Sequence, residues 1–590
     1  MTDSELSTEK IVQSYFNQKN ILNKHQIDSF NDFMDNILPN ILEQHSHIII
    51  NVNTNNIHTV EFELLLNTLN IEPPKYNENN GVENILYPDL ARCRNYSYSS
   101  LIFINILVTI KVIENESIIN LPSKKIENVL IGNIPIMVGS KYCSYTLNNK
   151  KHNDMGGYFI INGNEKVIIS QEKIANNIIQ IFNSKNVSYS YVCEIRSVND
   201  NKFSIPKLVS IKITNNSDIY NNNIYINIPN IKNSIPIIIL FRLFGTISDK
   251  DILNNIITND GSVIDKEIKK ILLPSFYKAN DIRSEVEAYQ YIIKNLNNHL
   301  IFKDNDKKIE YINENIKKNI FPHLDNDKKK SLYIGLMINK LLRCYLKIDN
   351  ITDRDSYIHK RIETPGALFG NLTYLCYNKM FKDFKTSIYS EYSSITIESI
   401  NNNLFKINTN NIHKFFKITM LESSLKSSLS TGNWGIKTNN FNKTGVSQVL
   451  NRLTYASSIS HLRRVSCGGD LTGKLIPPRK LHATSWGYLC PSETPEGHSI
   501  GLVKNLACSC EITIQCSSIP IRRLIKNKII DINDIDILTF DKSITKILIN
   551  GDWIGFTNEL DKLYDYLILQ RENGLINIYV SFYIDYKNNT

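Results

Sequence analysis

The pattern of apolar residues changes several times along the chain, and this succession restricts the possible folds more than any single property. Up to about residue 180, short alternating runs predict strands mixed with a few helices. Residues 131–138 and 158–170 are two such runs, and the pair Asn162-Gly163 inside the second predicts a hairpin turn. The alternation continues over residues 197–225, which are expected to form further strands.

Helical spacing replaces this alternation between residues 231 and 346. Residues 332–346 are apolar on nearly every side, which is typical of a buried helix. A break is expected at Thr364-Pro365-Gly366, because proline and glycine interrupt regular structure. A second helix is expected over residues 283–300, with one apolar face made by Val286, Tyr289, Ile293 and Leu296.

The C-terminal part of the chain has two further segments of different character. Residues 432–506 are rich in Gly, Pro, Arg and aromatic residues. Residues 516–590 predict a small unit in which strands near 546–550 and 576–582 flank a helix near 559–571. At roughly 100–200 residues per domain, a chain of 590 residues corresponds to about three to five compact units.

Charge and cysteine usage exclude some classes of protein. The net charge of +9, from 67 basic and 58 acidic residues, permits a polyanionic partner without demanding one. The ten cysteines form no CxxC pair, which argues against a disulfide framework and favours a reducing compartment. The first residues lack the apolar core of a signal peptide, and the most apolar run, 235–241, is too short to span a membrane. We therefore expect a soluble intracellular protein.

Most of the excess positive charge lies in one stretch of forty residues. Between Lys443 and His482 there are seven Lys or Arg residues and one acid, Asp470, which gives a local net charge of +6. Glycines at 468, 469 and 473 interrupt the stretch. Arginine forks and glycine turns suit contacts with phosphate backbones, although a solvated basic surface has the same composition.

The first half of this stretch predicts a helix. At about 100° per residue, one face is apolar, the opposite face is polar, and the phase is lost near residues 456–460, where we expect a break. The apolar face would consist of Val446, Val449, Leu450 and Leu453, and the opposite face of Gln448, Arg452 and Tyr455.

A turn-rich segment follows at residues 486–505. Pro491 and Pro495 fix the backbone, and Gly497 and Gly501 permit tight turns. Glu493 and Glu496 lie close in sequence to the basic stretch, where their carboxylates could orient arginines. The alternative is a surface turn whose glutamates are solvated.

Two clusters suggest metal sites that we do not assign. The cysteines at 490, 508, 510 and 516 have a spacing that fits no zinc ribbon or finger, so free thiols are the better interpretation. The aspartates at 531, 534 and 536 alternate with isoleucines as on a polar strand or turn, and with Asp541 they do not make a convincing metal site.

Several long motifs in this order resemble the β-like, second-largest subunits of multisubunit DNA-directed RNA polymerases, in their eukaryotic, archaeal and viral branch. The motifs that resemble the fork region of these subunits are TGNWG (431–435), GVSQVLNRLTY (445–455), SHLRR (460–464), PPRKLH (477–482), CPSETPEG (490–497) and GLVKNLA (501–507). Residues 25–33, 87–100, 132–140 and 154–172 are similar to the protrusion, residues 194–197 and 235–245 to the lobe, residues 353–366 to the return from the lobe, and residues 549–556 to external 1.

The resemblance implies an α+β multidomain fold for this chain. The implied order is an N-terminal tail (1–19), the first part of a protrusion (20–180), a lobe (181–364), the return part of the protrusion (365–430), a fork (431–515) and external 1 (516–590). In the fork, the residues expected to bind nucleic acid along the main channel are Gln448, Arg452, His461, Arg463 and Arg464, with Arg479 and Lys480 as secondary candidates and Glu493 and Glu496 as structural support.

The resemblance also implies the chemistry. Such a polymerase transfers nucleotides to the 3′-hydroxyl of RNA with the help of two metal ions, and the chain would act in it as a cleft wall that positions template DNA and transcript. We expect no catalytic residue and no cofactor on this chain, which would be inactive alone, with Mg²⁺ held by the largest subunit. The expected partners are that largest subunit, a polypeptide carrying the C-terminal half of this subunit, other polymerase subunits, template DNA and RNA, with no membrane.

Two departures from the family and two alternatives remain. The chain stops where a full-length member would be about half complete, and the loop after Arg464 reads VSCGGDLTG, which is less basic than in eukaryotic relatives. A free-standing nucleic-acid-binding protein or a fragment of a broken gene would also fit. The over-use of asparagine and isoleucine indicates AT-rich coding, which suits a large DNA virus, with action in a viral factory or the virion. A eukaryotic source would place the chain in the nucleus, and an archaeal source is the other possibility.

Overall fold

The structure is a computed structural model that describes residues 3–18, 20–53, 57–78, 80–114, 117–120, 123–150, 152–215, 222–228, 231–257, 263–295, 309–393, 412–435, 443–468, 475–532 and 544–586. It forms two compact units. The first consists of Met1–Lys173 and Lys360–Ile514, and the second of Ile174–His359 and Gln515–Thr590. The chain therefore mixes helices and sheets in more than one domain. The divisions between units fall within seven residues of the boundaries expected at 180, 364 and 515, but the named domains themselves stay predictions.

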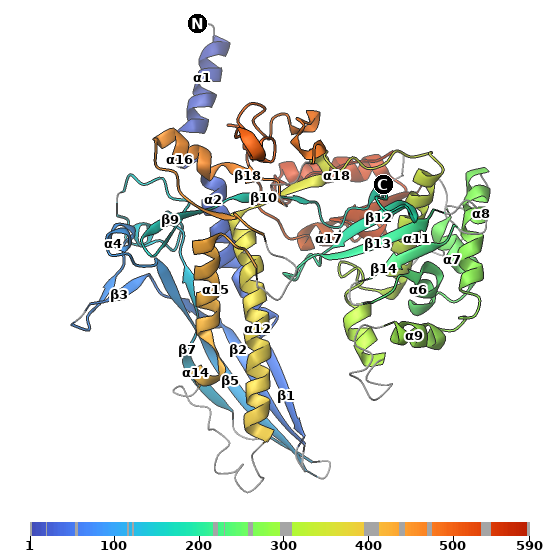
Figure 1. The fold of residues 1–590 in the computed structure, drawn as a ribbon, viewed down its shortest axis with the longest axis horizontal. Helices are drawn as coiled ribbons and strands as arrows, with labels where there is room; N and C mark the ends of the chain where they lie inside the picture. Colours follow the sequence, from blue (N-terminus) through green and yellow to red (C-terminus); the bar gives the residue numbers. More distant parts are fainter. Residues whose placement is uncertain are drawn as a thin grey trace. The chain divides into compact units, whose positions relative to one another are not determined.

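The core of the first unit is a long antiparallel sheet covered by helices. Its strands are β1 (His47–Asn53), β2 (Ile57–Ile71), β5 (Ser99–Glu114), β6 (Ser117–Asn120) and β7 (Lys124–Pro135), in the order β1-β2-β5-β6 with β7 also paired to β5. The helices α12 (Pro365–Ser393) and α15 (Ile418–Thr431) run beside each other along this sheet (Figure 1). Helix α12 begins at Pro365, which confirms the break expected there.

Aromatic side chains fill the space where α2 (Lys24–Asp32) meets α12. Phe369 on α12 stacks on Phe159 with ring centroids 5.6 Å apart, and Phe30 contacts both rings edge-on. Trp434 lies beside Phe369 and donates its ring N–H to the carbonyl of Leu368. This core fixes the position of the segments that follow residue 431.

Two smaller sheets of the first unit hold the basic stretch. One has the order β17-β9-β8, from β8 (Phe159–Ile161), β9 (Asn164–Ile168) and β17 (Ser447–Val449). The other has the order β16-β10-β18-β19, from β10 (Ser170–Ile174), β16 (Lys360–Glu363), β18 (Arg464–Ser466) and β19 (Val503–Asn505). Asn162 and Gly163 both have positive φ, at 49° and 78°, which confirms the predicted hairpin turn between β8 and β9.

The other elements of the first unit are short. They are α1 (Asp3–Phe16), a π-helical turn (Phe33–Ile37), α3 (Leu38–Glu43), β3 (Lys75–Asn77), β4 (Glu83–Ile85), α4 (Pro88–Cys93), α5 (Ser144–Leu147), α14 (Ile412–Phe415), α16 (Tyr455–Leu462) and 3₁₀ turns at Pro477–Arg479, Ala483–Ser485 and Gly497–Ser499.

The second unit packs helices against an antiparallel sheet. The sheet has the order β11-β12-β13-β14-β15, from β11 (Gln180–Asn183), β12 (Tyr189–Ser197), β13 (Lys207–Thr214), β14 (Ile224–Asn227) and β15 (Ile235–Pro236). Its helices are α6 (Ile237–Leu243), α7 (Asp249–Ile256), α8 (Val263–Lys278), α9 (Glu285–Lys294), a π-helical turn (Ile312–Lys317) and α11 (Asp327–Tyr345), with a 3₁₀ turn at Tyr357–His359. Helix α11 confirms the buried helix expected over residues 332–346.

The C-terminal segment of the second unit adds a three-stranded sheet of order β20-β22-β21. Its elements are α17 (Ile519–Ile525), β20 (Ile530–Asp531), β21 (Thr545–Ile549), β22 (Asp552–Thr557) and α18 (Leu560–Glu572). Trp553 and Phe556 of β22 form an apolar cluster with Leu332 of α11 and Ile532. The cluster joins this sheet to the helices of the same unit.

Two expectations from the sequence are wrong. Residues 576–582 form no strand, because the Asn577 side chain accepts the N–H of Tyr579 and its carbonyl accepts the N–H of Val580, which makes a turn. In α9, Tyr289 and Ile293 pack against the core as expected, but Val286 is exposed and the fully buried residues are Ala288 and Ile292, so the expected position of Val286 is wrong. Leu296 lies outside the described residues.

Within the described ranges, every helix is too short or too polar to cross a lipid bilayer. In the same ranges, no three His, Cys, Asp or Glu side chains come together in a way that could hold a metal ion. Asp534, Asp536 and Asp541 lie outside the described part. All ten cysteines are free thiols.

Candidate nucleic-acid interface

The basic stretch does not begin with the predicted helix. Residues 447–449 form strand β17, which pairs with β9, and helix α16 begins only at Tyr455. Val449 and Leu453, which the helical pattern would bury, are exposed. Thr454 caps α16 by accepting the N–H of Ser457, whose side chain accepts the N–H of Thr454 in return. The break expected near residues 456–460 is also wrong, because these residues lie inside α16.

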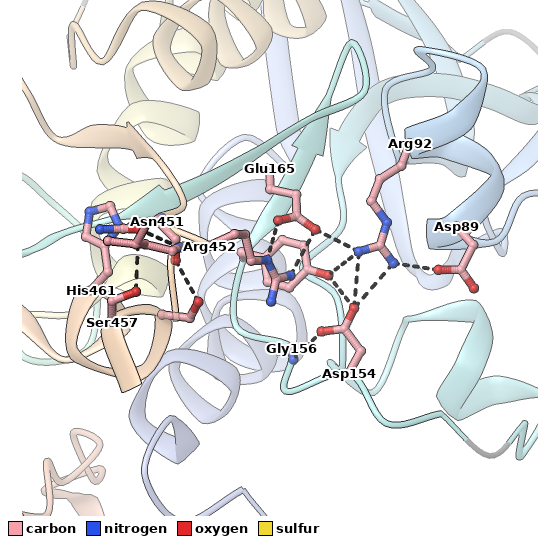
Figure 2. Close-up of polar contacts among 12 residues, drawn as sticks. Asp89, Arg92, Asp154, Gly156, Glu165, Asn451, Arg452, Ser457 and His461 are labelled. Carbon is pink, nitrogen blue, oxygen red and sulfur yellow. Dashed lines mark hydrogen bonds and ion pairs between the residues drawn. The ribbon is translucent and has the colours of Figure 1, made fainter. Parts of the chain in front are cut away.

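Arg452, in the loop between β17 and α16, is held by a carboxylate from the hairpin β8-β9. Its Nε lies 2.7 Å from Glu165 Oε2 and its Nη2 lies 2.9 Å from Glu165 Oε1, a bidentate ion pair (Figure 2). The guanidinium also lies over the ring of Tyr158, 5.1 Å from its centroid. Arg452 is therefore fixed to the sheet, although 39% of its side chain remains exposed.

A second arginine shares the same carboxylate. Arg92, on α4, donates from Nη1 to Glu165 Oε1 at 2.7 Å and from Nη2 to Asp89 at 2.6 Å, and Asp154 lies 3.3 Å from Nη2 (Figure 2). Burial alone would raise the pKa of Glu165, but hydrogen bonds and charges from Arg452 and Arg92 outweigh it and hold the pKa below its usual value. Glu165 thus stays ionised and connects α4 to the basic stretch.

His461 is buried and fixes the turn before α16. Its Nδ1 accepts the N–H of Asn451, and its Nε2 lies 3.0 Å from Gln448 Oε1. Burial, and then the charge of Arg464, lower the pKa of His461 to about 4. The ring is therefore neutral at pH 7, and Nε2 is the donor to Gln448.

Arg463 points into the protein. Its side chain is buried and donates to the carbonyls of Leu22 and Ala507, each at 2.6 Å, and to that of Cys508 at 3.4 Å. These acceptors come from the segment before α2 and from the residues after β19. The guanidinium therefore ties three separate segments together and has few donors left for another molecule.

Arg464 differs from its neighbour. It begins β18, where it pairs with Asn505 of β19, and its side chain is half-buried. Its Nε is buried and has no hydrogen-bond partner in the described part of the chain. Burial lowers the pKa of Arg464, and the charge of Glu493 opposes the shift. Arg464 thus offers a cation that the described residues do not neutralise by direct contact.

The secondary candidates lie in the turn-rich segment. Arg479 donates from Nη1 to the carbonyls of His498 and Ile500, at 2.7 and 3.0 Å. Gly501 has φ of +69° and a Cβ there would lie 2.3 Å from the Arg479 carbonyl oxygen, so the turn requires glycine. Lys480 is exposed and has no partner among the described residues.

Glu493 and Glu496 make fewer contacts with the basic stretch than expected. Glu493 accepts a hydrogen bond from the Ser460 hydroxyl on α16. Glu496 is exposed. Within the described ranges, neither carboxylate forms an ion pair with an arginine. Gly469, Asp470, Gly473 and Lys474, in the loop after Arg464, lie outside these ranges.

Sequence reasoning missed the carboxylates that organise this surface. Glu165, Asp154 and Arg92 lie within motifs of the protrusion resemblance, but nothing in their local pattern marks them. Glu165 is 287 residues from Arg452, so only paired substitutions in an alignment could have indicated the contact.

The fold defines a multidomain chain of mixed helices and sheets, and comparisons with known proteins show its family. The family described as RNA polymerase beta subunit matches residues 21–414, and RNA polymerase Rpb2, domain 3 matches residues 448–512. The chain therefore belongs to the RNA polymerase beta subunit family. The second match covers the segment that holds Arg452, His461, Arg463 and Arg464.

Individual relatives come from three kinds of source. DNA-directed RNA polymerase II subunit 2 of Arabidopsis thaliana is 32% identical over 95% of this chain and 48% of its own length. DNA-directed RNA polymerase subunit 2 of Acanthamoeba polyphaga mimivirus is 31% identical over 96% and 48%. DNA-directed RNA polymerase subunit Rpo2 of Sulfolobus acidocaldarius is 28% identical over 98% and 49%. The chain thus spans about half the length of these curated relatives.

Proposed function

We propose that this chain is part of the second-largest subunit of a DNA-directed RNA polymerase and forms a wall of its active-centre cleft. The observation that carries the proposal is Arg464, a half-buried cation without a hydrogen-bond partner for its Nε in the described residues, inside the segment that matches domain 3. A phosphate at the solvent-facing side of Arg464 would supply the missing countercharge. Arg464 and Lys480 would then contact nucleic acid, while Arg452, Arg463, His461 and Gln448 hold the surface in shape.

In this proposal the named domains of the family apply. Residues 20–180 and 365–430 form the protrusion, 181–364 the lobe, 431–515 the fork and 516–590 external 1. Family membership and the order of the matched segments support this division. Arg463, which connects the segment before α2 to the fork, would transmit the position of the protrusion to the fork.

The reaction would be nucleotidyl transfer, and this chain would contribute no catalytic group. The largest subunit would hold Mg²⁺, which stabilises the attacking and leaving oxygens. The partners would be that largest subunit, other polymerase subunits, template DNA and transcript, together with the portion of the subunit that corresponds to the remaining length of the relatives. The compartment would follow the source: viral factory or virion for a virus, nucleus for a eukaryote.

A tagged chain tests this proposal by co-purification from its source cells. We expect mass spectrometry to identify a largest polymerase subunit at equal stoichiometry, and the purified complex to extend a primed template. The Arg464→Met variant should still assemble but lose template retention, whereas Glu496→Gln, an exposed control on the same segment, should retain it.

A free-standing nucleic-acid-binding protein is the competing function. Such a protein would purify without polymerase subunits, and the purified chain would bind DNA as tightly as the chain in cell extract does. That result, with a correctly folded chain, would contradict the polymerase role.

A further inference from the structure

Three basic side chains gather in the second unit, on elements other than those of the candidate interface. Lys340 and Arg343 lie one turn apart on α11, and Lys546 lies on β21. Leu332 and Leu336, earlier on α11, pack in one cluster with Leu548 and Trp553 of the β21-β22 hairpin. The apolar cluster thus holds the helix against the hairpin that carries Lys546, and the charges of Lys340 and Arg343 act on Lys546.

Among the described residues, Asp349 is the one carboxylate that forms an ion pair with any of these cations. Arg343 donates from Nε to Asp349 at 2.8 Å, so that acid is already neutralised. Neither Lys340 nor Lys546 has a hydrogen bond or ion pair within the described ranges. Asp552, at the start of β22, is held by Arg522 at 2.7 Å, and Glu194 of β12 lies 3.7 Å from Arg354. These two acids are therefore engaged elsewhere.

Burial increases the free-energy cost of placing these three cations close together. Burial, followed by the charges of Lys340 and Arg343, lowers the pKa of Lys546 to about 8. Lys340 also acts on the thiols of Cys193 and Cys344, and burial raises the pKa of both, so these thiols carry no countercharge. An anion placed among the three cations would remove their mutual repulsion.

We propose that Lys340, Arg343 and Lys546 form a binding site for a phosphoryl oxyanion. Two lysines supply mobile point donors and Arg343 a planar fork, a combination that suits the several oxygens of a phosphate group. The phosphate group could be inorganic or belong to a nucleotide or nucleic-acid strand. The site does not depend on the proposed polymerase role, because it lies on other elements and needs no other subunit.

A different explanation is that the ring of Trp553 alone compensates Lys546. The Lys546 Nζ lies 5.5 Å from the centroid of this ring, within the range of a cation–π contact. In that case the site would be complete without a ligand, and added phosphate would change nothing at Lys546.

Acylation of lysines in the purified chain distinguishes these explanations. The chain is treated with an acylating reagent in inorganic phosphate or in chloride of equal ionic strength, and the labelling rate of each lysine is followed by mass spectrometry. If the Kd is about 1 mM, phosphate at about 10 mM should slow labelling of Lys546 roughly tenfold. Exposed Lys382, on α12 in the other unit, is the internal control and should label at the same rate in both salts.

Two variants and a second probe complete the test. Lys340→Gln should abolish the protection of Lys546, while Lys562→Gln, on the exposed side of α18, should leave it intact. A 5′-phosphorylated trinucleotide replaces phosphate in a parallel series. Protection by both probes supports a free-phosphate site, and protection by the trinucleotide alone supports a nucleic-acid phosphate. Unchanged labelling of Lys546 with both probes, in the wild-type chain with its native circular dichroism, overturns the proposal.

Discussion

Arg463 and Arg464 are adjacent in sequence, yet the structure predicts opposite consequences for their replacement. Arg463→Met keeps the aliphatic stem but removes two hydrogen bonds of 2.6 Å and a longer one to main-chain carbonyls. Hydrogen bonds from a charged donor contribute roughly 1.5–3 kcal/mol each, so we expect the first unit to lose about 3–5 kcal/mol. Arg464→Met removes a half-buried cation whose Nε has no partner, and the free chain should lose less than about 1 kcal/mol.

Hydrogen exchange of the free chain measures this difference without assuming that the two units unfold together. Peptides from α2 and from residues 503–507 report on the segments that Arg463 connects. They should exchange much faster in Arg463→Met and at the wild-type rate in Arg464→Met. Peptides from α11, in the second unit, provide the control and should not change in either variant.

In an assembled polymerase, Arg464→Met should have a larger effect than it has in the free chain. Arg464→Met should shorten the lifetime of the elongation complex by about tenfold to a hundredfold if its phosphate contact is shielded from solvent, which corresponds to roughly 1.5–3 kcal/mol. Stability losses of similar size in both variants of the free chain would refute the assignment of Arg463 to the interior and Arg464 to the interface. A wild-type lifetime for Arg464→Met would refute the contact itself.

Three other predictions concern the same unit and the whole chain. Glu165→Gln should weaken its pairs with Arg452 and Arg92 and lower the stability of the first unit by about 1 kcal/mol in chemical denaturation, whereas Glu127→Gln, an exposed control, should not. Burial lowers the pKa of His25 and of His461 to about 4 each, below the unfolded value of 6.5, so the unfolded chain binds more protons as the pH falls. The free energy of unfolding should therefore decrease by on the order of 1 kcal/mol per histidine between pH 7 and pH 5. A flat stability profile over this range would contradict their neutral, buried state. The isolated chain should synthesise no RNA on a primed template with Mg²⁺ and nucleotides, and template-dependent synthesis by it alone would refute the proposed division of labour.

Local patterns predicted the elements that local interactions determine. The Asn162-Gly163 turn, the buried helix α11 and the start of α12 at Pro365 depend on backbone preference or on a long apolar run, and all three are present. Residues 446–453 have helical spacing, but residues 447–449 pair with β9, because an edge strand from a distant part of the sequence offers hydrogen bonds to their backbone. That strand is invisible to any local window.

The candidate site shows the same limit at the level of side chains. The sequence identified the basic stretch by its net charge of +6, but charge alone does not show which cations are already bound. Lys443 lies 2.7 Å from Glu363, and Arg452 is paired with Glu165. Both carboxylates lie outside the stretch, so the count of cations overstates the surface available to a ligand.

The salt dependence of nucleic-acid binding measures how many cations of the basic stretch contact phosphate groups. Among the described cations of the stretch, Lys443 and Arg452 are ion-paired, and Arg463 and Arg479 donate to main-chain carbonyls, which leaves Arg464 and Lys480 for phosphate contacts. Each phosphate contact contributes about 0.9 to the slope of log K against log salt, so replacing both residues with methionine should reduce the slope of the assembled enzyme by about 2. Replacing Lys443 and Arg452 in the same way should change it by much less than 1. Equal changes from the two double variants would show that the internal ion pairs open when nucleic acid binds, and that the whole basic stretch faces the channel.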